Sequence, residues 1–185
     1  MMTELSLNVL DVAENSVKAK ATLIEISVCS DTVKDLMTIV IKDNGCGMDE
    51  EQLKRVCDPF YTTRTTRKVG LGVSFFKLAA ESAGGEFEIT SEKGVGTTVT
   101  ATFVISSIDR MPLGDMTSTM HSLITLNTDT DFVYRYRVDE REFVLDTREL
   151  REILEGVPFN VPDVSDYIRE YLSENKKETD GDIIL

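Results

Sequence analysis

Side chains with carboxylate or amide oxygens, glycines and basic residues recur in four short segments of the chain. In order, they are residues 11–16 (Asp-Val-Ala-Glu-Asn-Ser), 43–48 (Asp-Asn-Gly-Cys-Gly-Met), 58–64 (Asp-Pro-Phe-Tyr-Thr-Thr-Arg) and 69–73 (Val-Gly-Leu-Gly-Val). Each segment alone is a weak signal, because short glycine patterns occur by chance. A strand is expected before the second segment and a helix after the fourth. This order favours one shared pocket.

The first segment lies on a helix expected over residues 4–19, whose apolar residues recur at helical spacing. Asn8, Asp11 and Asn15 form a polar stripe on another face of that helix. The amide oxygen of Asn15 is a hard ligand suited to Mg²⁺, which takes its remaining bonds from water and phosphate. An ordinary solvated helix face is the alternative interpretation of the stripe.

The second segment begins where an apolar strand over residues 36–42 ends. A carboxylate at Asp43 can accept a hydrogen bond from the amino group of adenine, whereas guanine would present an oxygen there. Gly45 and Gly47 allow the backbone to turn close to a base, and Met48 can pack on its ring. A simple hairpin turn is the alternative, but a helix rather than a partner strand is expected next.

The last two segments supply groups suited to phosphate. Gly70, Leu71 and Gly72 open a helix, where free backbone N–H groups and the positive end of the helix favour an anion. A basic trio precedes them, formed by Arg64, Arg67 and Lys68. We expect at least one of the three to contact phosphate, the alternative being a solvated loop.

Together the segments resemble the N, G1, F and G2 boxes of the GHKL superfamily, the ATP-binding domains of gyrase, heat-shock chaperones, histidine kinases and mismatch-repair ATPases. The resemblance covers about residues 3–105. It implies that Asn15 binds Mg²⁺, that Thr97 helps hold a water beside adenine, and that residues 58–69 form the ATP lid. The implied ATP-contacting residues are Asn15, Asp43, Gly45, Gly47, Met48, Thr63, Arg64, Arg67, Lys68, Gly70, Leu71, Gly72, Val73 and Thr97.

The resemblance also gives Asp11 a possible catalytic role. Mismatch-repair-like members carry a Glu at the matching position, which activates the attacking water, and many histidine kinases carry an amide. Asp is one methylene shorter than Glu, so the base role and the plain helix face both stay open for Asp11. The fourth segment reads Gly-Leu-Gly-Val where many kinases have Gly-Leu-Gly-Leu, a change of volume only at Val73.

Composition limits the partners. The 185 residues carry a net charge of −13, which disfavours nonspecific binding to nucleic acid or to an anionic membrane. No apolar stretch approaches the ~20 residues of a membrane span, and the first residues lack a signal-peptide pattern. Three cysteines without a CxxC spacing, Cys29, Cys46 and Cys57, indicate reduced thiols in a cytoplasmic protein.

The pattern of elements predicts an α/β two-layer sandwich, with a mixed sheet, helices on one face and an ATP lid. Residues 1–105 would form the ATP-binding domain, with further helices over 49–57 and 71–83 and strands over 22–29, 86–90 and 96–105.

A C-terminal α/β extension is expected over residues 106–173, with a helix that Pro112 opens, a hairpin within 132–145, a capped helix ending at Gly156 and a final amphipathic helix. We expect residues 174–185 to be disordered. The apolar faces of the extension must be buried, so we expect it to serve a protein partner or a homodimer. The alternative is that they cover the free face of the sheet and complete one monomeric fold.

The single histidine, His121, does not fit a phosphate acceptor. Sensor kinases phosphorylate a histidine placed before the ATP domain and usually followed by an acidic residue, whereas His121 follows the domain and precedes Ser122. We therefore expect a Mg-dependent ATP-binding protein that transfers phosphate to a separate partner. An ATPase switch using Asp11 as base and a regulatory ATP binder without turnover are the alternatives.

Overall fold

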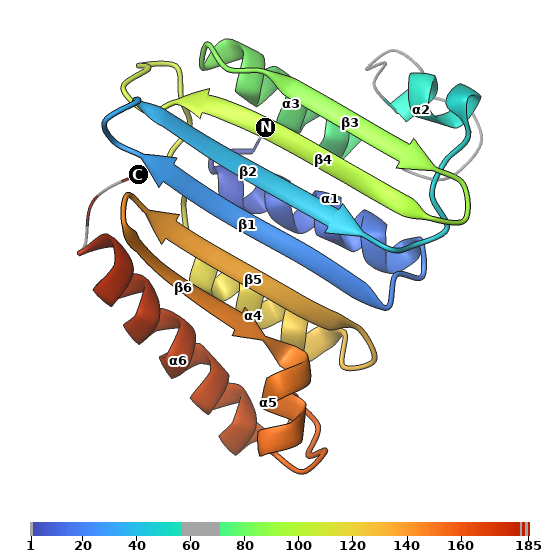
Figure 1. Ribbon diagram of the computed structural model, residues 1–185, viewed down its shortest axis with the longest axis vertical. Helices are drawn as coiled ribbons and strands as arrows, with labels where there is room; N and C mark the ends of the chain where they lie inside the picture. The colour runs from blue at the N-terminus through green and yellow to red at the C-terminus, as the bar shows by residue number, and fades with distance from the viewer. Residues whose placement is uncertain (1, 57–70, 182, 184) are drawn as a thin grey trace.

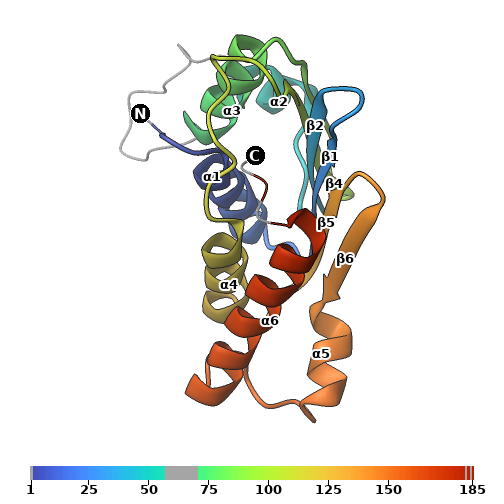
Figure 2. The same cartoon turned by 90° about the vertical axis from the view of Figure 1, so that its left-hand side faces the viewer.

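The computed structural model describes residues 2–56, 71–181, 183 and 185, and these residues form a six-stranded mixed sheet with helices on one face (Figures 1 and 2). The elements, in chain order, are α1 (Leu5–Lys18), β1 (Leu23–Asp31), β2 (Leu36–Asp43), α2 (Glu50–Val56), α3 (Leu71–Ser82), β3 (Phe87–Glu92), β4 (Gly96–Val104), α4 (Met116–Leu126), β5 (Asp131–Val138), β6 (Arg141–Asp146), α5 (Thr147–Ile153) and α6 (Pro162–Asp180). The strand order is β3-β4-β2-β1-β5-β6. The predicted two-layer sandwich is confirmed.

The two central strands each bury one face only. Along β1 and β2, buried and half-buried residues alternate, and Ile26 pairs with Ile41 in an antiparallel register. The sequence of β2 is mostly apolar, yet its alternate residues face the open side of the sheet and are not fully buried. That side is polar, with ion pairs such as Glu25–Lys42 at 3.3 Å. A sheet with one polar face needs no second helical layer.

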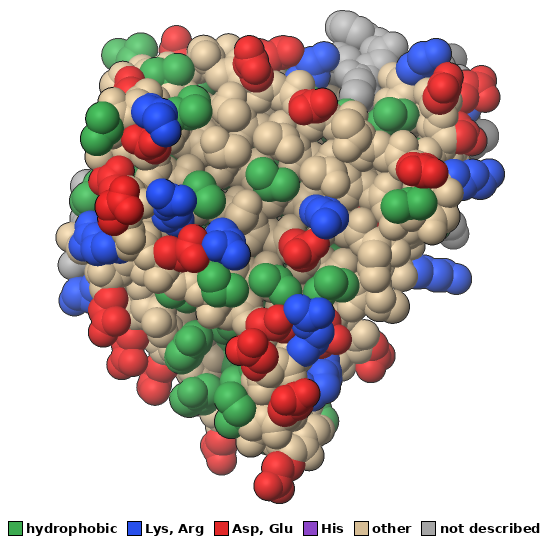
Figure 3. Space-filling model, viewed as in Figure 1, with side chains coloured by type: hydrophobic (Ala, Val, Ile, Leu, Met, Phe, Trp, Pro, Cys, Tyr) green, Lys and Arg blue, Asp and Glu red, His purple; other side chains and the backbone are tan. Residues whose placement is uncertain are grey.

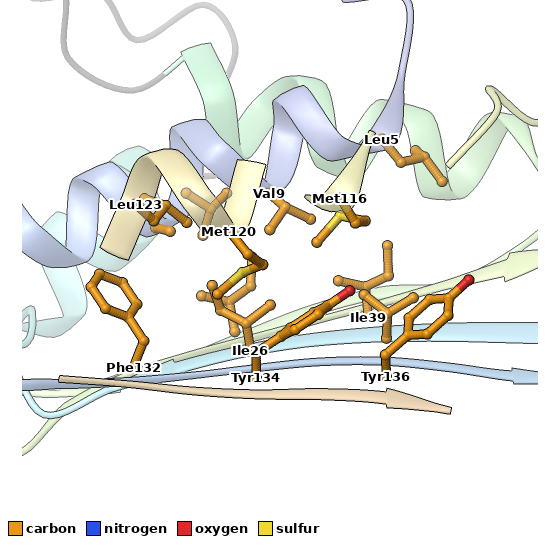
Figure 4. Packing of buried hydrophobic residues seen from close by; sticks show 14 of the residues in the cluster. Leu5, Val9, Ile26, Ile39, Met116, Met120, Leu123, Phe132, Tyr134 and Tyr136 are labelled. Carbon is orange, nitrogen blue, oxygen red and sulfur yellow. The ribbon is translucent and has the colours of Figure 1, made fainter. Parts of the chain in front are cut away.

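One hydrophobic core joins both parts of the chain. In Figure 4, Leu5 and Val9 of α1 and Met116 of α4 pack against side chains of the sheet, among them Ile39 of β2 and Tyr134 of β5. All five side chains are at most 2% exposed. Residues after 105 are therefore part of the same core as the residues before it.

The extension widens the sheet and leaves its open face uncovered. β5 runs parallel to β1, from the Leu23–Asp131 pair to the Ser30–Val138 pair, and β6 pairs antiparallel with β5. On the helical face α4 lies beside α1, where the Thr119 hydroxyl donates to the carbonyl of Ser6 at 3.5 Å. The extension thus completes one continuous fold.

Pro112 does not open the helix that follows it. α4 begins four residues later, and Asp115 caps it by accepting the backbone N–H of Ser118 at 2.8 Å. The carbonyl of Pro112 instead accepts the N–H of Leu5 at 3.0 Å, which satisfies a free donor at the start of α1. The expected helix exists, but its first turn comes later than Pro112.

The last helix is longer than the polar sequence suggested. α6 continues to Asp180, so residues 174–180 are helical and the prediction that they are disordered is wrong. Asp180 is fully buried and accepts hydrogen bonds from the Tyr136 hydroxyl at 3.0 Å and from Lys176 at 2.6 Å. Burial and the Asp180 carboxylate raise the pKa of the Tyr136 phenol, so it stays a donor. These tertiary contacts outweigh the weak local preference of a polar segment.

The described helices include none that is both long enough and apolar enough to cross a membrane.

Candidate functional site

The first and second segments and the described end of the fourth, at Val73, meet at a cavity of about 540 Å³ under α1, beside α2 and the first turn of α3. The ends of β2 and β4 form its floor, because Asp43 pairs with Thr97 across these two strands. Six predicted site residues line the cavity, namely Asn15, Asp43, Gly47, Met48, Val73 and Thr97. The sequence-based site is therefore one place in the fold.

The carboxylate of Asp43 is held in place by donors from two directions. One oxygen, Oδ2, accepts the hydroxyl of Ser16 at 2.5 Å, and Oδ1 accepts the N–H of Gly45 at 2.8 Å. A carboxylate offers about four acceptor positions, so some remain for a ligand in the cavity. Ser16 is buried on α1 and also lines the cavity. Sequence analysis missed this residue, although it directly follows Asn15.

The glycines of the second segment allow the backbone of this loop to pack closely against neighbouring backbone. Gly47 has a φ of +62°, and a Cβ there would collide with the carbonyl oxygen of Glu92. Gly45 is buried against the end of α1, where a Cβ would lie 2.9 Å from the Ala19 oxygen. Gly96, which sequence analysis did not select, has a φ of +141° and lies against the Asp43 backbone. These close approaches bring the loop after β2 onto the β3–β4 hairpin.

A hydroxyl pair fixes the other side of the floor. The Ser91 and Thr97 hydroxyls lie 2.8 Å apart, and the N–H of Met48 donates to Ser91 Oγ at 2.8 Å. Met48 and Thr97 are thereby held beside Asp43. Ser91 was also missed, because its partners lie on other elements and no local pattern points to them.

Asn15 and Asp11 lie one turn apart on α1. Asn15 is half-buried and lines the cavity. Asp11 touches α3 instead, where a Cβ on Gly72 would be 2.9 Å from the Asp11 Cβ and 3.2 Å from its Oδ2. Burial raises the pKa of the Asp11 carboxyl, the charge of Glu14 raises it further, and Lys18 opposes both.

The residues present fit a magnesium ion that arrives with phosphate. In residues 2–56 and 71–181, no three His, Cys, Asp or Glu side chains are grouped so as to hold an ion. Mg²⁺ commonly takes only one or two protein ligands and fills its octahedron with phosphate and water. The single amide oxygen of Asn15 suits such an ion.

Several predicted contacts lie outside the described residues. They are Thr63, Arg64, Arg67, Lys68 and Gly70, together with the lid that contains them. Leu71 begins α3. The phosphate contacts expected of these residues stay predictions.

His121 is remote from the cavity lining. It is 8% exposed on α4, and its Nε2 lies 2.8 Å from the hydroxyl of Ser165 on α6. Burial lowers the pKa of His121, and the charge of Arg169 lowers it further. The side chain joins two helices.

Comparison with known proteins identifies the first part of the chain. The model of the family "Histidine kinase-, DNA gyrase B-, and HSP90-like ATPase" matches residues 2–106. A putative sensor protein of Shewanella frigidimarina is 37% identical over 102 residues, which are 54% of this chain and 16% of that protein. Sporulation kinase E of Bacillus subtilis is 44% identical over 64 residues, which are 35% of this chain and 8% of the kinase. The chain spans less than a fifth of the length of these relatives.

Solved structures share the fold beyond the region that the family model matches. The Aquifex aeolicus MutL ATPase domain complexed with ADP superimposes with a TM-score of 0.50 at 17% identity, covering 84% of this chain and 70% of that domain. The N-terminal domain of a DNA repair protein gives a TM-score of 0.56 at 16% identity, covering 78% and 53%. Both structures cover a larger share of this chain than residues 2–106 make up. The common fold therefore includes part of the extension. Since the family model matches more than half of its length, this chain belongs to the histidine kinase-, DNA gyrase B- and HSP90-like ATPase family.

Proposed function

We propose that this chain binds Mg-ATP in the 540 Å³ cavity and transfers the terminal phosphate to a separate protein. The observation that carries the proposal is the convergence of Asp43, Asn15 and Thr97 on that cavity, with Asp43 oriented by Ser16. Family membership supports ATP binding, and the names of several relatives, a sensor protein and a sporulation kinase among them, favour phosphotransfer.

Each residue in the proposal has a distinct task. Asp43 accepts the amino group of adenine, because its carboxylate keeps acceptor positions free of Ser16 and Gly45. Met48 packs on the base. Asn15 contributes its amide oxygen to the metal, and bound Mg²⁺ neutralises charge on the phosphates.

The acceptor is proposed to lie on another chain. In the transfer, the bond between the γ-phosphorus and the bridging oxygen of ADP breaks, and a bond to a nucleophilic side chain of the partner forms. His121 is a poor acceptor in this fold, because it is buried and hydrogen-bonded between α4 and α6. Any phosphorylation of this chain should therefore persist in His121→Gln.

A second function, an ATPase switch, is favoured by the environment of Asp11. Its carboxyl lies against Gly72 at the start of α3, and burial raises its pKa above the usual value of an aspartic acid. In this alternative Asp11 would activate water and ATP would be hydrolysed.

Incubation of the full chain with γ-labelled ATP, alone and with cell lysate, separates these functions. The proposal expects label on a second protein, unaffected in Asp11→Asn, which keeps the volume of the side chain. Release of inorganic phosphate that stops in Asp11→Asn would establish the switch instead. ATP binding without release or transfer of phosphate would indicate a regulatory ATP binder and would contradict both enzymatic functions.

The metal role of Asn15 has its own test. Asn15→Ala should bind ATP more weakly than wild type in Mg²⁺ but equally in EDTA, because only the metal contact is lost. Losing one ligand contact to a charged group corresponds to about 10- to 100-fold in affinity. Calorimetry of both proteins in both buffers measures this, with Asn160→Ala, an exposed amide remote in sequence, as the control. Unchanged affinity in Mg²⁺ would mean that Asn15 is not the ligand.

A further inference from the structure

An apolar groove lies between β6, α5 and α6, on the C-terminal part of the molecule. Val144, Leu150, Ile153, Tyr167, Ile168 and Tyr171 line it. Ile153 is 75% exposed and Tyr167 50% exposed, both large values for side chains of this kind. Figure 3 shows hydrophobic side chains gathered where these elements lie in Figure 1. Contiguous exposed apolar surface marks an interaction site more often than isolated exposed residues do.

The rim of this groove is acidic. On α6, Tyr167 has Asp163 one turn before it and Glu170 one turn after it, so the acids flank the same face. Glu149 of α5 lines the groove directly. Figure 3 shows acidic side chains around the hydrophobic ones. The exposed acidic residues of the two helices are Glu149, Glu152, Asp163, Asp166, Glu170, Glu174 and Glu178.

Basic residues of the same helices are engaged in contacts of their own. Arg148 pairs with Asp146 at 2.6 Å, and Arg151 pairs with Asp131 at 3.0 Å. Lys176 pairs with the buried Asp180 at 2.6 Å. Arg169 of α6 lies beside His121, with its Nη2 3.4 Å from Nδ1. Together α5 and α6 carry eight acidic and five basic residues, Lys177 included, so this part of the surface keeps a net negative field that a cationic ligand would complement.

We propose that this groove docks a basic amphipathic helix of a partner protein. Tyr167 and Tyr171 are one turn apart and form a ridge on α6, which suits a helix presenting apolar residues at i, i+3 and i+4. Lysine or arginine beside that apolar stripe would meet the acidic rim. A second copy of this chain fits poorly, because a symmetric contact would set the acidic rims against each other. The inference rests on the proposed transfer to a separate protein, but not on nucleotide binding.

The test uses fluorescence anisotropy of labelled peptides against the full chain at 0.15 M salt without nucleotide. The probe is an amphipathic Leu/Lys peptide of about 18 residues, or five helical turns. A scrambled Leu/Lys peptide controls for charge alone, and a Leu/Glu peptide controls for the apolar face alone. The amphipathic Leu/Lys peptide should bind at least about tenfold tighter than either control, since both features contribute.

Substitutions locate the binding. Ile153→Ser and Tyr167→Ala should each weaken binding of the Leu/Lys peptide about tenfold, as expected for losing one buried apolar side chain. Both residues are exposed, so circular dichroism should show an unchanged fold. Val33→Ser is the matched control, because Val33 is 92% exposed between β1 and β2, far from the groove in sequence.

Three outcomes of the peptide experiment would overturn the inference. They are no binding, equal binding of the scrambled peptide, and binding that neither substitution weakens. A dimer seen by light scattering and dissolved by Ile153→Ser would make a second copy the occupant and would also overturn it. Asp43→Asn should leave peptide affinity unchanged, so a failure here is separate from a failure of the proposed ATP site.

Discussion

At the scale of the residue, the orientation of Asp43 decides how the cavity can recognise a base. Its carboxylate is fixed by the Ser16 hydroxyl and the Gly45 N–H before any ligand arrives. A preorganised acceptor loses less freedom on binding than a mobile one. Under the proposed function, such a carboxylate would select the amino group of adenine by position as well as by charge.

Asp43→Asn should lower ATP affinity about 10- to 100-fold, because a charge-assisted hydrogen bond of roughly 1.5–3 kcal/mol is lost. Ser16→Ala should cost less, about 2- to 10-fold, since it removes only a neutral donor to the carboxylate. Isothermal titration calorimetry measures both. Glu25→Gln is the control, because Glu25 lies on the open face of the sheet in a surface ion pair with Lys42. Unchanged affinity in Asp43→Asn would remove the adenine assignment.

The reactivity of one cysteine thiol, that of Cys46, can show whether ATP occupies the same cavity. Cys46 is a free, exposed cysteine that lines it. Bound ATP should cover this thiol and slow its alkylation by N-ethylmaleimide, as followed by peptide mass spectrometry. Cys29 is the internal control, because it lies on β1 away from the cavity and burial raises the pKa of its thiol. Equal slowing at both cysteines, or at neither, would contradict ATP binding in this cavity.

The site could be predicted as far as its residues form local patterns. Asn15 and Asp43 belong to short segments whose chemistry suits ATP, Thr97 is implied by the family resemblance, and all three line the cavity. Ser16 and Ser91 could not be found in this way, because each acts through a partner on another element. Their roles depend on tertiary distances that a single sequence does not contain.

At the scale of the element, the contact between α4 and α6 depends on His121. Its imidazole is hydrogen-bonded to Ser165, with Arg169 and Asp166 as the charged neighbours that shift its pKa. A neutral ring suits this place, because burial and Arg169 both disfavour the cation and together outweigh Asp166.

Acidification should weaken this contact. The pKa of folded His121 lies below its ordinary value of 6.5, so the unfolded chain binds the proton first as the pH falls. His121 therefore lowers the free energy of unfolding below about pH 6.5, and the loss stops below the folded pKa. Urea unfolding of wild type and His121→Gln between pH 5 and pH 8 should show a smaller pH dependence in the variant. Parallel curves would show that His121 does not carry the effect.

Elements with strong periodicity could be predicted, and their ends could not. The apolar stripe of α1 and the alternation of β5 and β6 match the structure closely. The C-terminus of α6 lies further along the chain than the sequence predicted. The contacts of Asp180 with Tyr136 and Lys176 stabilise the last turn, and local helix propensity does not include such tertiary contacts.

At the scale of the whole molecule, the extension is part of the core. Tyr134 and Tyr136 of β5 are at most 2% exposed, and Met120 of α4 is fully buried in the same core. Sequence analysis left open whether the extension serves a partner or completes the fold. The structure supports completion of the fold, and the exposed groove on its outer side leaves room for the partner as well.

Truncation after Ser107 should therefore yield a chain that aggregates or melts far below the full-length protein. Each buried aromatic that is removed contributes roughly 1.5–3 kcal/mol, and several together rival the 5–15 kcal/mol of a typical domain. Differential scanning calorimetry and light scattering measure this. Full-length Asp43→Asn is the control, because it loses nucleotide affinity with its core intact. A soluble truncated chain with wild-type ATP affinity would make the extension dispensable for the fold.

The parallel pairing of β1 with β5 also sets the timing of assembly. β1 finds its antiparallel neighbour β2 almost at once, but its other edge awaits residues such as Asp131, which pairs with Leu23. Ribosomes add about 5–20 residues per second, so that edge stays open for roughly 5–20 s during synthesis. An unpaired strand edge invites pairing with other chains. The nascent ATP-binding half thus passes through a period of vulnerability that ends only when the last third of the polypeptide emerges.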